Sequence, residues 1–307
     1  MNFDWQGRID TEDGPLAERW HQRMNTIREP NAKTLALLGF KTDEGVARNK
    51  GRIGAKDGPN ALRAAAANLP VSHPINLRDD GDIAVQGSDL ESAQADVGNW
   101  VANKLRCNEF PLVIGGGHEI AYASYLGWRN WAAGARTLGI INLDAHLDLR
   151  KPNPQGSSGT PFYQIAQSME RDNQPFKYWV LGASEVANTT ALFNRAADLG
   201  VRVNYDSELN LSSLDHLEAD ILEFCKTVDD IYLTIDLDVL QAAFMPAVSA
   251  PAAGGLSLAI VERLIAQVMT SGKVRLADLA ELNPVYDIDG LGAKTAARLL
   301  YRISRYL

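Results

Sequence analysis

The chain has 307 residues, 46% of them hydrophobic, which allows one large core or two smaller ones. A formal net charge of −8 disfavours nucleic acid and anionic membranes as partners, and no apolar run reaches the ~20 residues of a membrane-spanning helix. The two cysteines, Cys107 and Cys225, are too few for a disulfide framework. Together with a polar start at residues 1–5, which does not look like a signal peptide, they predict a cytoplasmic location.

Short apolar runs alternate with longer amphipathic stretches along the chain. The runs predict interior strands at 34–38, 111–114, 138–143, 178–181, 201–203, 231–235 and 274–279. Apolar residues three and four apart predict helices at 88–106, 215–226, 257–270 and 293–306, with Gly272 capping the third. This alternation predicts an α/β fold whose parallel sheet is covered on both faces. We expect one domain over residues 1–307, with 1–30 as a candidate N-terminal arm.

Three clusters of metal-ligand residue types each follow a predicted strand. They are Gly115–His118, Asp144–Asp148 and Asp236–Asp238. Ligands of open α/β sheets bind at the carboxyl ends of the strands, so we expect the three clusters to meet at one edge. Two loops rich in Gly, Pro and Ser, at 150–161 and 239–255, follow the second and third clusters and would border the same place.

The spacing within the clusters suits a pair of metal ions. Asp144, His146 and Asp148 alternate, as do Asp236 and Asp238, and on extended backbone alternate side chains share a face. We therefore expect five ligands to face one cavity, with His118 as a sixth. A lone His after glycines is usually structural, and a lone Asp-x-Asp is often a turn. The prediction of a metal site therefore depends on the fact that all three clusters follow predicted strands.

The charges of these residues indicate which metal they would hold. Burying carboxylates at strand ends is costly without a cation, and four aspartates would be neutralised by two divalent ions. Oxygen-rich ligands with few imidazoles favour manganese over zinc. Six ligands are too many for one tetrahedral zinc, which disfavours a mononuclear zinc hydrolase. Two metals close together would lower the pKa of a water molecule between them and make it a nucleophile.

These residues resemble the ureohydrolase family of arginases, agmatinases and formimidoylglutamases. The resemblance extends from Gly58–Arg63 to Glu281–Pro284. It implies a three-layer α/β/α fold with a mostly parallel sheet of about eight strands, two Mn²⁺ ions per subunit and a homo-oligomer. One metal would be bound by His118, Asp144, Asp148 and Asp236. The other would be bound by Asp144, His146, Asp236 and Asp238, so that Asp144 and Asp236 bridge the two ions.

The loop after the second cluster resembles the formimidoylglutamases most closely. Arginases and many agmatinases carry a His in this loop, where this chain has Phe162, so a proton shuttle built on that His is absent. The Ser157–Phe162, Gly117–Ile120 and Asn188–Thr189 segments also resemble the formimidoylglutamases. The resemblance implies hydrolysis of the amidine C–N bond of N-formimidoyl-L-glutamate to L-glutamate and formamide, in histidine degradation.

The resemblance also suggests which residues act on the substrate. Glu281 matches the position that pairs with the amidinium, and Asp148 would pass the proton of the attacking hydroxide to the leaving amine. The substrate's carboxylates need basic or donor-rich walls. Arg150 is the first candidate, as a bidentate clamp, with Asn153 and Ser158 as further donors. Alternatively, Glu281 is a surface residue near a strand end and Arg150 forms a surface salt bridge.

Two other functions stay open at this point. One is another ureohydrolase, acting on agmatine, guanidinobutyrate or a similar guanidine and releasing urea. Phe162 and Arg150 argue against its cationic substrates. The other is a catalytically idle metal-binding homologue, which the presence of every expected ligand disfavours.

Overall fold

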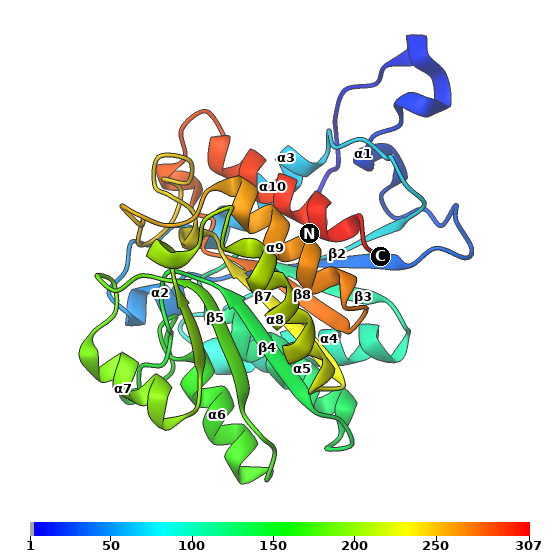
Figure 1. Ribbon diagram of the computed structural model, residues 1–307. Helices are drawn as coiled ribbons and strands as arrows, with labels where there is room; N and C mark the ends of the chain where they lie inside the picture. Colours follow the sequence, from blue (N-terminus) through cyan, green and yellow to red (C-terminus); the bar gives the residue numbers. More distant parts are fainter. Residues whose placement is uncertain (1–2) are drawn as a thin grey trace.

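The computed structural model describes residues 3–307, built around one eight-stranded sheet (Figure 1). All neighbouring strands pair in parallel, in the spatial order β2-β1-β3-β8-β7-β4-β5-β6. The strands are β1 (Thr34–Lys41), β2 (Asn76–Ala84), β3 (Phe110–Ile114), β4 (Leu138–Leu143), β5 (Lys177–Ala183), β6 (Arg202–Tyr205), β7 (Asp230–Asp236) and β8 (Val274–Ala280).

Helices cover both faces of the sheet, so the predicted three-layer α/β/α architecture is confirmed (Figure 1). The helices of one layer are α1 (Trp20–Arg23), α3 (Gly58–Ala66), α8 (Leu214–Lys226), α9 (Leu258–Thr270) and α10 (Leu291–Ser304). Those of the other are α4 (Leu90–Arg106), α5 (Ile120–Ala132), α6 (Pro161–Arg171) and α7 (Thr190–Asp198). The connections contain α2 (Glu44–Arg48) and 3₁₀ turns at Thr11–Ala17, Ala55–Asp57, Asp206–Glu208, Leu237–Val239 and Pro284–Tyr286. No described helix is long and apolar enough to cross a membrane.

The apolar runs form central strands because both of their faces are buried. In β7, Leu233 and Ile235 belong to one hydrophobic core and Tyr232 to the other, and none of the three is exposed. Strands covered by helices on both faces need such continuous runs. The predicted cap of α9 is also confirmed. Gly272 follows the helix with a φ of 67°, a conformation that favours glycine, and its N–H bonds to the carbonyl of Met269.

All seven predicted strands form, and β2 is the one that the sequence pattern missed. It is an edge strand with three aspartates and an arginine among nine residues, so it lacks an apolar run. Its charges are used in packing. The guanidinium of Arg63, on α3, is fully buried and pairs with Asp79 at 2.9 Å and with Asp82.

The N-terminal segment is tied to the same edge of the sheet. The Trp20 side chain is fully buried, and the indole N–H of Trp5 donates to Asp79 at 2.8 Å. The blue segment at the upper right of Figure 1 reaches beyond the sheet. Cys107 and Cys225 are free thiols. The single-domain assignment and the cytoplasmic location stay predictions.

Candidate metal centre and substrate cavity

Four neighbouring strands in the middle of the sheet supply the predicted site residues. In the order β3-β8-β7-β4, each strand ends at the same edge. His118 lies four residues beyond β3, Glu281 directly follows β8, Asp236 ends β7 and Asp144 directly follows β4. Residues more than 160 positions apart in the sequence are therefore brought together by strand order alone.

The glycine run before His118 is required by close packing. Gly116 has a φ of 72°, and a Cβ there would lie 2.9 Å from the carbonyl oxygen of Phe40. The carbonyl of Gly116 accepts a hydrogen bond from the backbone N–H of Glu281 at 2.8 Å. The turn therefore joins the end of β3 to the end of β8 and fixes His118 beside Glu281.

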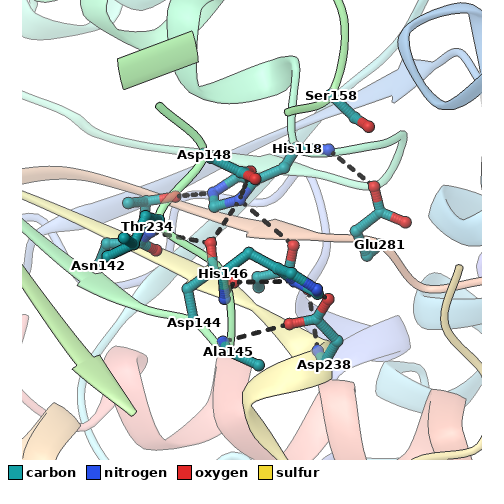
Figure 2. Close-up of polar contacts among 12 residues, drawn as sticks. His118, Asn142, Asp144, Ala145, His146, Asp148, Ser158, Thr234, Asp238 and Glu281 are labelled. Carbon is teal, nitrogen blue, oxygen red and sulfur yellow. Dashed lines mark hydrogen bonds and ion pairs between the residues drawn. The ribbon is translucent and has the colours of Figure 1, made fainter. Parts of the chain in front are cut away.

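The first group of candidate ligands surrounds the His118 ring. Its members are His118, Asp144, Asp148 and Asp236, and one ligand atom from each lies within 4.8 Å of the others. Nδ1 of His118 is 3.0 Å from Asp144, 3.0 Å from Asp148 and 3.2 Å from Asp236. Its Nε2 is 2.9 Å from the hydroxyl of Thr234, so the opposite nitrogen faces the carboxylates (Figure 2).

The second group shares one carboxylate with the first. It comprises Asp144, His146 and Asp238. Nδ1 of His146 is 2.9 Å from Asp238 and 3.6 Å from Asp144. Figure 2 shows these side chains pointing toward one another. Asp144 thus contacts both groups, as expected of a bridging ligand, whereas the structure groups Asp236 only with the first.

The expectation of extended backbone through the aspartate clusters is wrong. Asp148 has a φ of 47°, in the left-handed region, and Asp238 lies in a 3₁₀ turn. The carboxylates themselves fold these turns. Asp144 accepts from the backbone N–H of His146 at 2.6 Å, and Asp236 accepts from that of Asp238 at 2.9 Å. The side chains converge through local hydrogen bonds rather than through strand alternation.

Burial and charge crowding shift the ionisation of the carboxylates. Burial, with the neighbouring carboxylates, raises the pKa of Asp148 to about 6 and that of Asp236 to about 8. Burial also raises the pKa of Asp238. Asp144 is the exception: burial opposes its ionisation, but the two imidazoles lower its pKa.

The pKa values of the two imidazoles are raised, whereas burial alone would lower them. Asp238 raises the pKa of His146, and burial of His118 is outweighed by Asp144, Asp148 and Asp236, so both imidazoles have pKa values well above the usual 6.5. Such a concentration of buried acids is what bound cations stabilise. The mixed carboxylate and imidazole donors fit divalent ions such as Mn²⁺.

Glu281 offers a buried anion beside this cluster. Its backbone has a φ of 69°, and only 4% of its surface is exposed. Oε1 accepts from the backbone N–H of His118 at 3.0 Å, and Oε2 has no hydrogen-bond partner among the described residues (Figure 2). A buried carboxylate oxygen without a partner is costly unless a ligand supplies the donor. This supports the predicted role in binding a cationic group.

A cavity of about 330 Å³ opens onto the two groups of ligands. Arg150 and Ser158, two of the candidate substrate-binding residues, line it. The Arg150 side chain is exposed, and Oγ of Ser158 accepts from the amide of Asn49 at 3.2 Å. Asn153 does not reach this cavity. It lies with Lys151 in a neighbouring hollow, which Arg150 also borders.

The segment Asn49–Arg52 forms the cavity wall that the sequence pattern missed. It is separated from the apolar strand β1 by α2 and so does not directly follow a strand, as the three clusters do. The carbonyl of Gly45 accepts from the backbone N–H of Ser158 at 3.0 Å, which joins the loop around α2 to the loop after the second cluster. Two cations beside a glycine were the available signal, but such residues are common in solvated loops.

Phe162 occupies the loop position at which arginases and many agmatinases carry a histidine. It is fully buried, its ring centroid lies 5.3 Å from that of His118, and it stacks on Tyr178 at 4.3 Å. The side chain at this position therefore contributes to packing and provides no titratable group.

A larger cavity, of about 460 Å³, lies away from the site, near the start of β4. It contains none of the candidate ligands. Its arginines are already paired, Arg129 with Asp172 and Arg136 with Asp230. Size alone therefore does not identify the functional cavity.

Comparison with known proteins agrees with this geometry. A model of the arginase family matches residues 33–304. The formimidoylglutamase of Chromobacterium violaceum is 48% identical over 303 residues, which cover 99% of this chain and 97% of that protein. The crystal structure of Trypanosoma cruzi formiminoglutamase with Mn²⁺ matches with a TM-score of 0.81 and 27% identity, over 94% of this chain and 97% of that one. A formimidoylglutamase from Bacillus subtilis, 20% identical, shares the fold with a TM-score of 0.85, over 100% of this chain and 95% of its own.

Proposed function

This chain belongs to the arginase family, and on that premise we propose that it hydrolyses N-formimidoyl-L-glutamate to L-glutamate and formamide with two Mn²⁺ ions. The observation that carries the proposal is the convergence at one cavity of two metal-ligand groups and Glu281, whose Oε2 has no hydrogen-bond partner among the described residues. The 48% identity to a formimidoylglutamase over nearly the whole chain supports this substrate.

The two groups of ligands would each hold one ion. We assign His118, Asp144, Asp148 and Asp236 to one, and Asp144, His146 and Asp238 to the other, with Asp236 as a second bridging ligand on family resemblance. Bound divalent metals lower the pKa of water and supply hydroxide near neutral pH. The Trypanosoma cruzi formiminoglutamase was crystallised with Mn²⁺, which supports manganese over other divalent ions.

Two carboxylates would handle the substrate's amidine. Oε2 of Glu281 is buried and has no partner within residues 3–307, and it would accept a charge-assisted hydrogen bond from the amidinium and orient it. Asp148 lines the cavity beside the other candidate ligands, and its carboxylate could take a proton from the attacking hydroxide and return it. It would deliver that proton to the leaving amine of glutamate.

The walls of the cavity would hold the substrate's carboxylates. Arg150 lines the cavity and its guanidinium has no hydrogen-bond partner among the described residues, so it is free to bind an anion. Ser158 would add a hydroxyl donor. Asn153, in the neighbouring hollow, would act through the shape of the loop rather than by contact. Homo-oligomerisation and a cytoplasmic location are further proposals from the sequence and family.

A substrate panel tests the proposal. The protein is loaded with Mn²⁺ and given N-formimidoyl-L-glutamate, arginine, agmatine and guanidinobutyrate, with formamide, glutamate and urea measured. We expect formamide and glutamate from the first compound and no urea from the others. Urea from a guanidine would overturn the substrate while retaining the metal site. If none of the four compounds is hydrolysed by protein with two ions bound, a catalytically idle homologue would be favoured.

A further inference from the structure

A second arginine on the cavity wall, Arg52, is rigidly held and has no acidic partner among the residues that the structure describes. Its Nε donates to the carbonyl of Ser249 at 3.0 Å, and one Nη donates to the carbonyl of Val248 at 2.5 Å. Its guanidinium lies over the ring of Tyr286, 3.8 Å from the centroid. Among residues 3–307 no carboxylate lies within 4.0 Å of it. A half-buried cation without an anion is costly, which indicates that a ligand supplies the charge.

The backbone of Arg52 is fixed by the same segment that carries Glu281. The side-chain amide of Asn283 donates to the carbonyls of Arg52 at 3.0 Å and Ile53 at 3.1 Å. Asn283 is fully buried, and a Cβ at Gly54 would lie 2.4 Å from its Oδ1. The position of Arg52 is thereby coupled to that of Glu281, the proposed amidinium partner, only two residues before Asn283.

The free donors of Arg52 suit a carboxylate. A guanidinium has five N–H donors, and the two carbonyls use two of them. Three remain on the two terminal nitrogens, which is the pair of atoms that binds a carboxylate bidentately. Because carbonyls and the Tyr286 ring already hold the side chain, little rotamer entropy is lost on binding.

The charges around the cavity also favour the binding of an anionic ligand. Two divalent ions would neutralise the four aspartates, which leaves Glu281 against three cations, Lys50, Arg52 and Arg150. A protonated amidine that pairs with Glu281 and carries two carboxylates has a net charge of −1 and would reduce this positive excess. A guanidine substrate with a free amine would add to it.

We propose that Arg52 binds a carboxylate of the substrate and is, with Arg150, a specificity-determining residue for amidines of dicarboxylic acids. This inference rests on the proposed function and adds a second anion-binding residue from a different loop. Two carboxylates are then matched by two arginines, both on the wall of the cavity that holds Glu281.

Arg52→Gln tests the inference, with Lys56→Gln as the control. Lys56 lies four residues away, is exposed and does not line the cavity, so its variant loses the same charge outside the site. We expect Arg52→Gln to raise KM for N-formimidoyl-L-glutamate about 10- to 100-fold with kcat within about threefold. With N-propylformamidine, which has no carboxylate, kcat/KM should stay within about twofold. The control should match the parent with both compounds.

A binding measurement separates this inference from the proposed function. Calorimetric titration of the Mn²⁺-loaded protein with L-glutamate should show weaker binding in Arg52→Gln by a factor similar to the change in KM, whether or not formimidoylglutamate is turned over. Arg52→Lys, which keeps the charge but not the planar fork, should fall between the parent and Arg52→Gln. Unchanged glutamate affinity in Arg52→Gln, with two ions bound and an unaltered melting temperature, would overturn the role of Arg52. An equal loss on the substrate with and without carboxylates would overturn it too.

Discussion

Loading the metal-free site at pH 7 should release about three protons from its ligands. The imidazoles of His118 and His146, whose pKa values are well above 6.5, each hold one proton that a metal must displace. Asp236, with a pKa of about 8, is about nine-tenths protonated at pH 7. Asp148, with a pKa of about 6, adds only about a tenth of a proton. The ligands therefore release about three protons, and a metal-bound water that ionises to hydroxide would add up to one more.

The sign of the pH dependence follows from the same groups. All four have pKa values in the folded protein above their ordinary values. In the metal-free protein, the stability that their protonated forms contribute is present at low pH and is lost as the pH rises through the raised pKa values. Metal competes with those same protons, so its affinity rises over the same range. Between about pH 6 and 8.5, the melting temperature of the metal-free protein should fall, while that of the protein in fixed, subsaturating Mn²⁺ should rise relative to it.

Calorimetric titration with Mn²⁺ in two buffers of different ionisation enthalpy counts the protons. The slope of the observed enthalpy against the buffer enthalpy gives the number released for both ions together. A value between about three and four agrees with the structure. A value below one would mean that the ligands are already deprotonated, and it would refute the account of burial and charge crowding.

Three substitutions extend this account. Asp148→Asn should lower kcat about 100-fold or more, because it removes the group that carries the proton, and near-native turnover would exclude that role. Its metal content must be measured alongside, since Asp148 is also a candidate ligand. Arg150→Ala should raise KM about tenfold or more with a modest change in kcat, and an unchanged KM would refute the clamp. Phe162→Ala should lower the free energy of unfolding by about 3–5 kcal/mol, because it leaves a cavity between His118 and Tyr178; urea unfolding measures this, and a loss below about 1 kcal/mol would contradict the packing role.

The interior strands were predictable because burial of both faces requires a continuous run of apolar residues in the sequence. Central parallel strands need apolar residues on both faces, as in 231–235. Strand β2 could not be found this way, because an edge strand can be charged if a partner elsewhere neutralises it. Arg63, from α3, supplies that partner to Asp79 and Asp82, and the pairing appears only when the chain is folded.

The identities of the candidate ligands were predictable, but their local geometry was not. Three clusters after three strands pointed to one sheet edge, and strand order places them there. Alternation on extended backbone predicts the right residues, but hydrogen bonds accepted by Asp144 and Asp236 fold turns there instead. A turn in which an aspartate accepts a hydrogen bond from the backbone N–H two residues later has the same sequence spacing as an extended strand with alternating ligands.

The cavity wall was the least predictable part. Arg52 is placed by Asn283, about 230 residues later in the chain, and by carbonyls of the loop at 248–249. No local pattern in the sequence records such contacts. Asn153 shows the converse, because it lies only three residues after Arg150 in the sequence and yet does not line the cavity.

The central claim is that this site breaks the bond between the amidine carbon and the nitrogen of glutamate. Asp148 would protonate that nitrogen while Glu281 holds the amidinium. NMR analysis of the products from Mn²⁺-loaded protein and N-formimidoyl-L-glutamate tests the claim directly. Formamide and L-glutamate in equal amounts are the predicted products. N-formyl-L-glutamate and ammonia would show that the other C–N bond breaks, and would contradict the proton delivery assigned to Asp148.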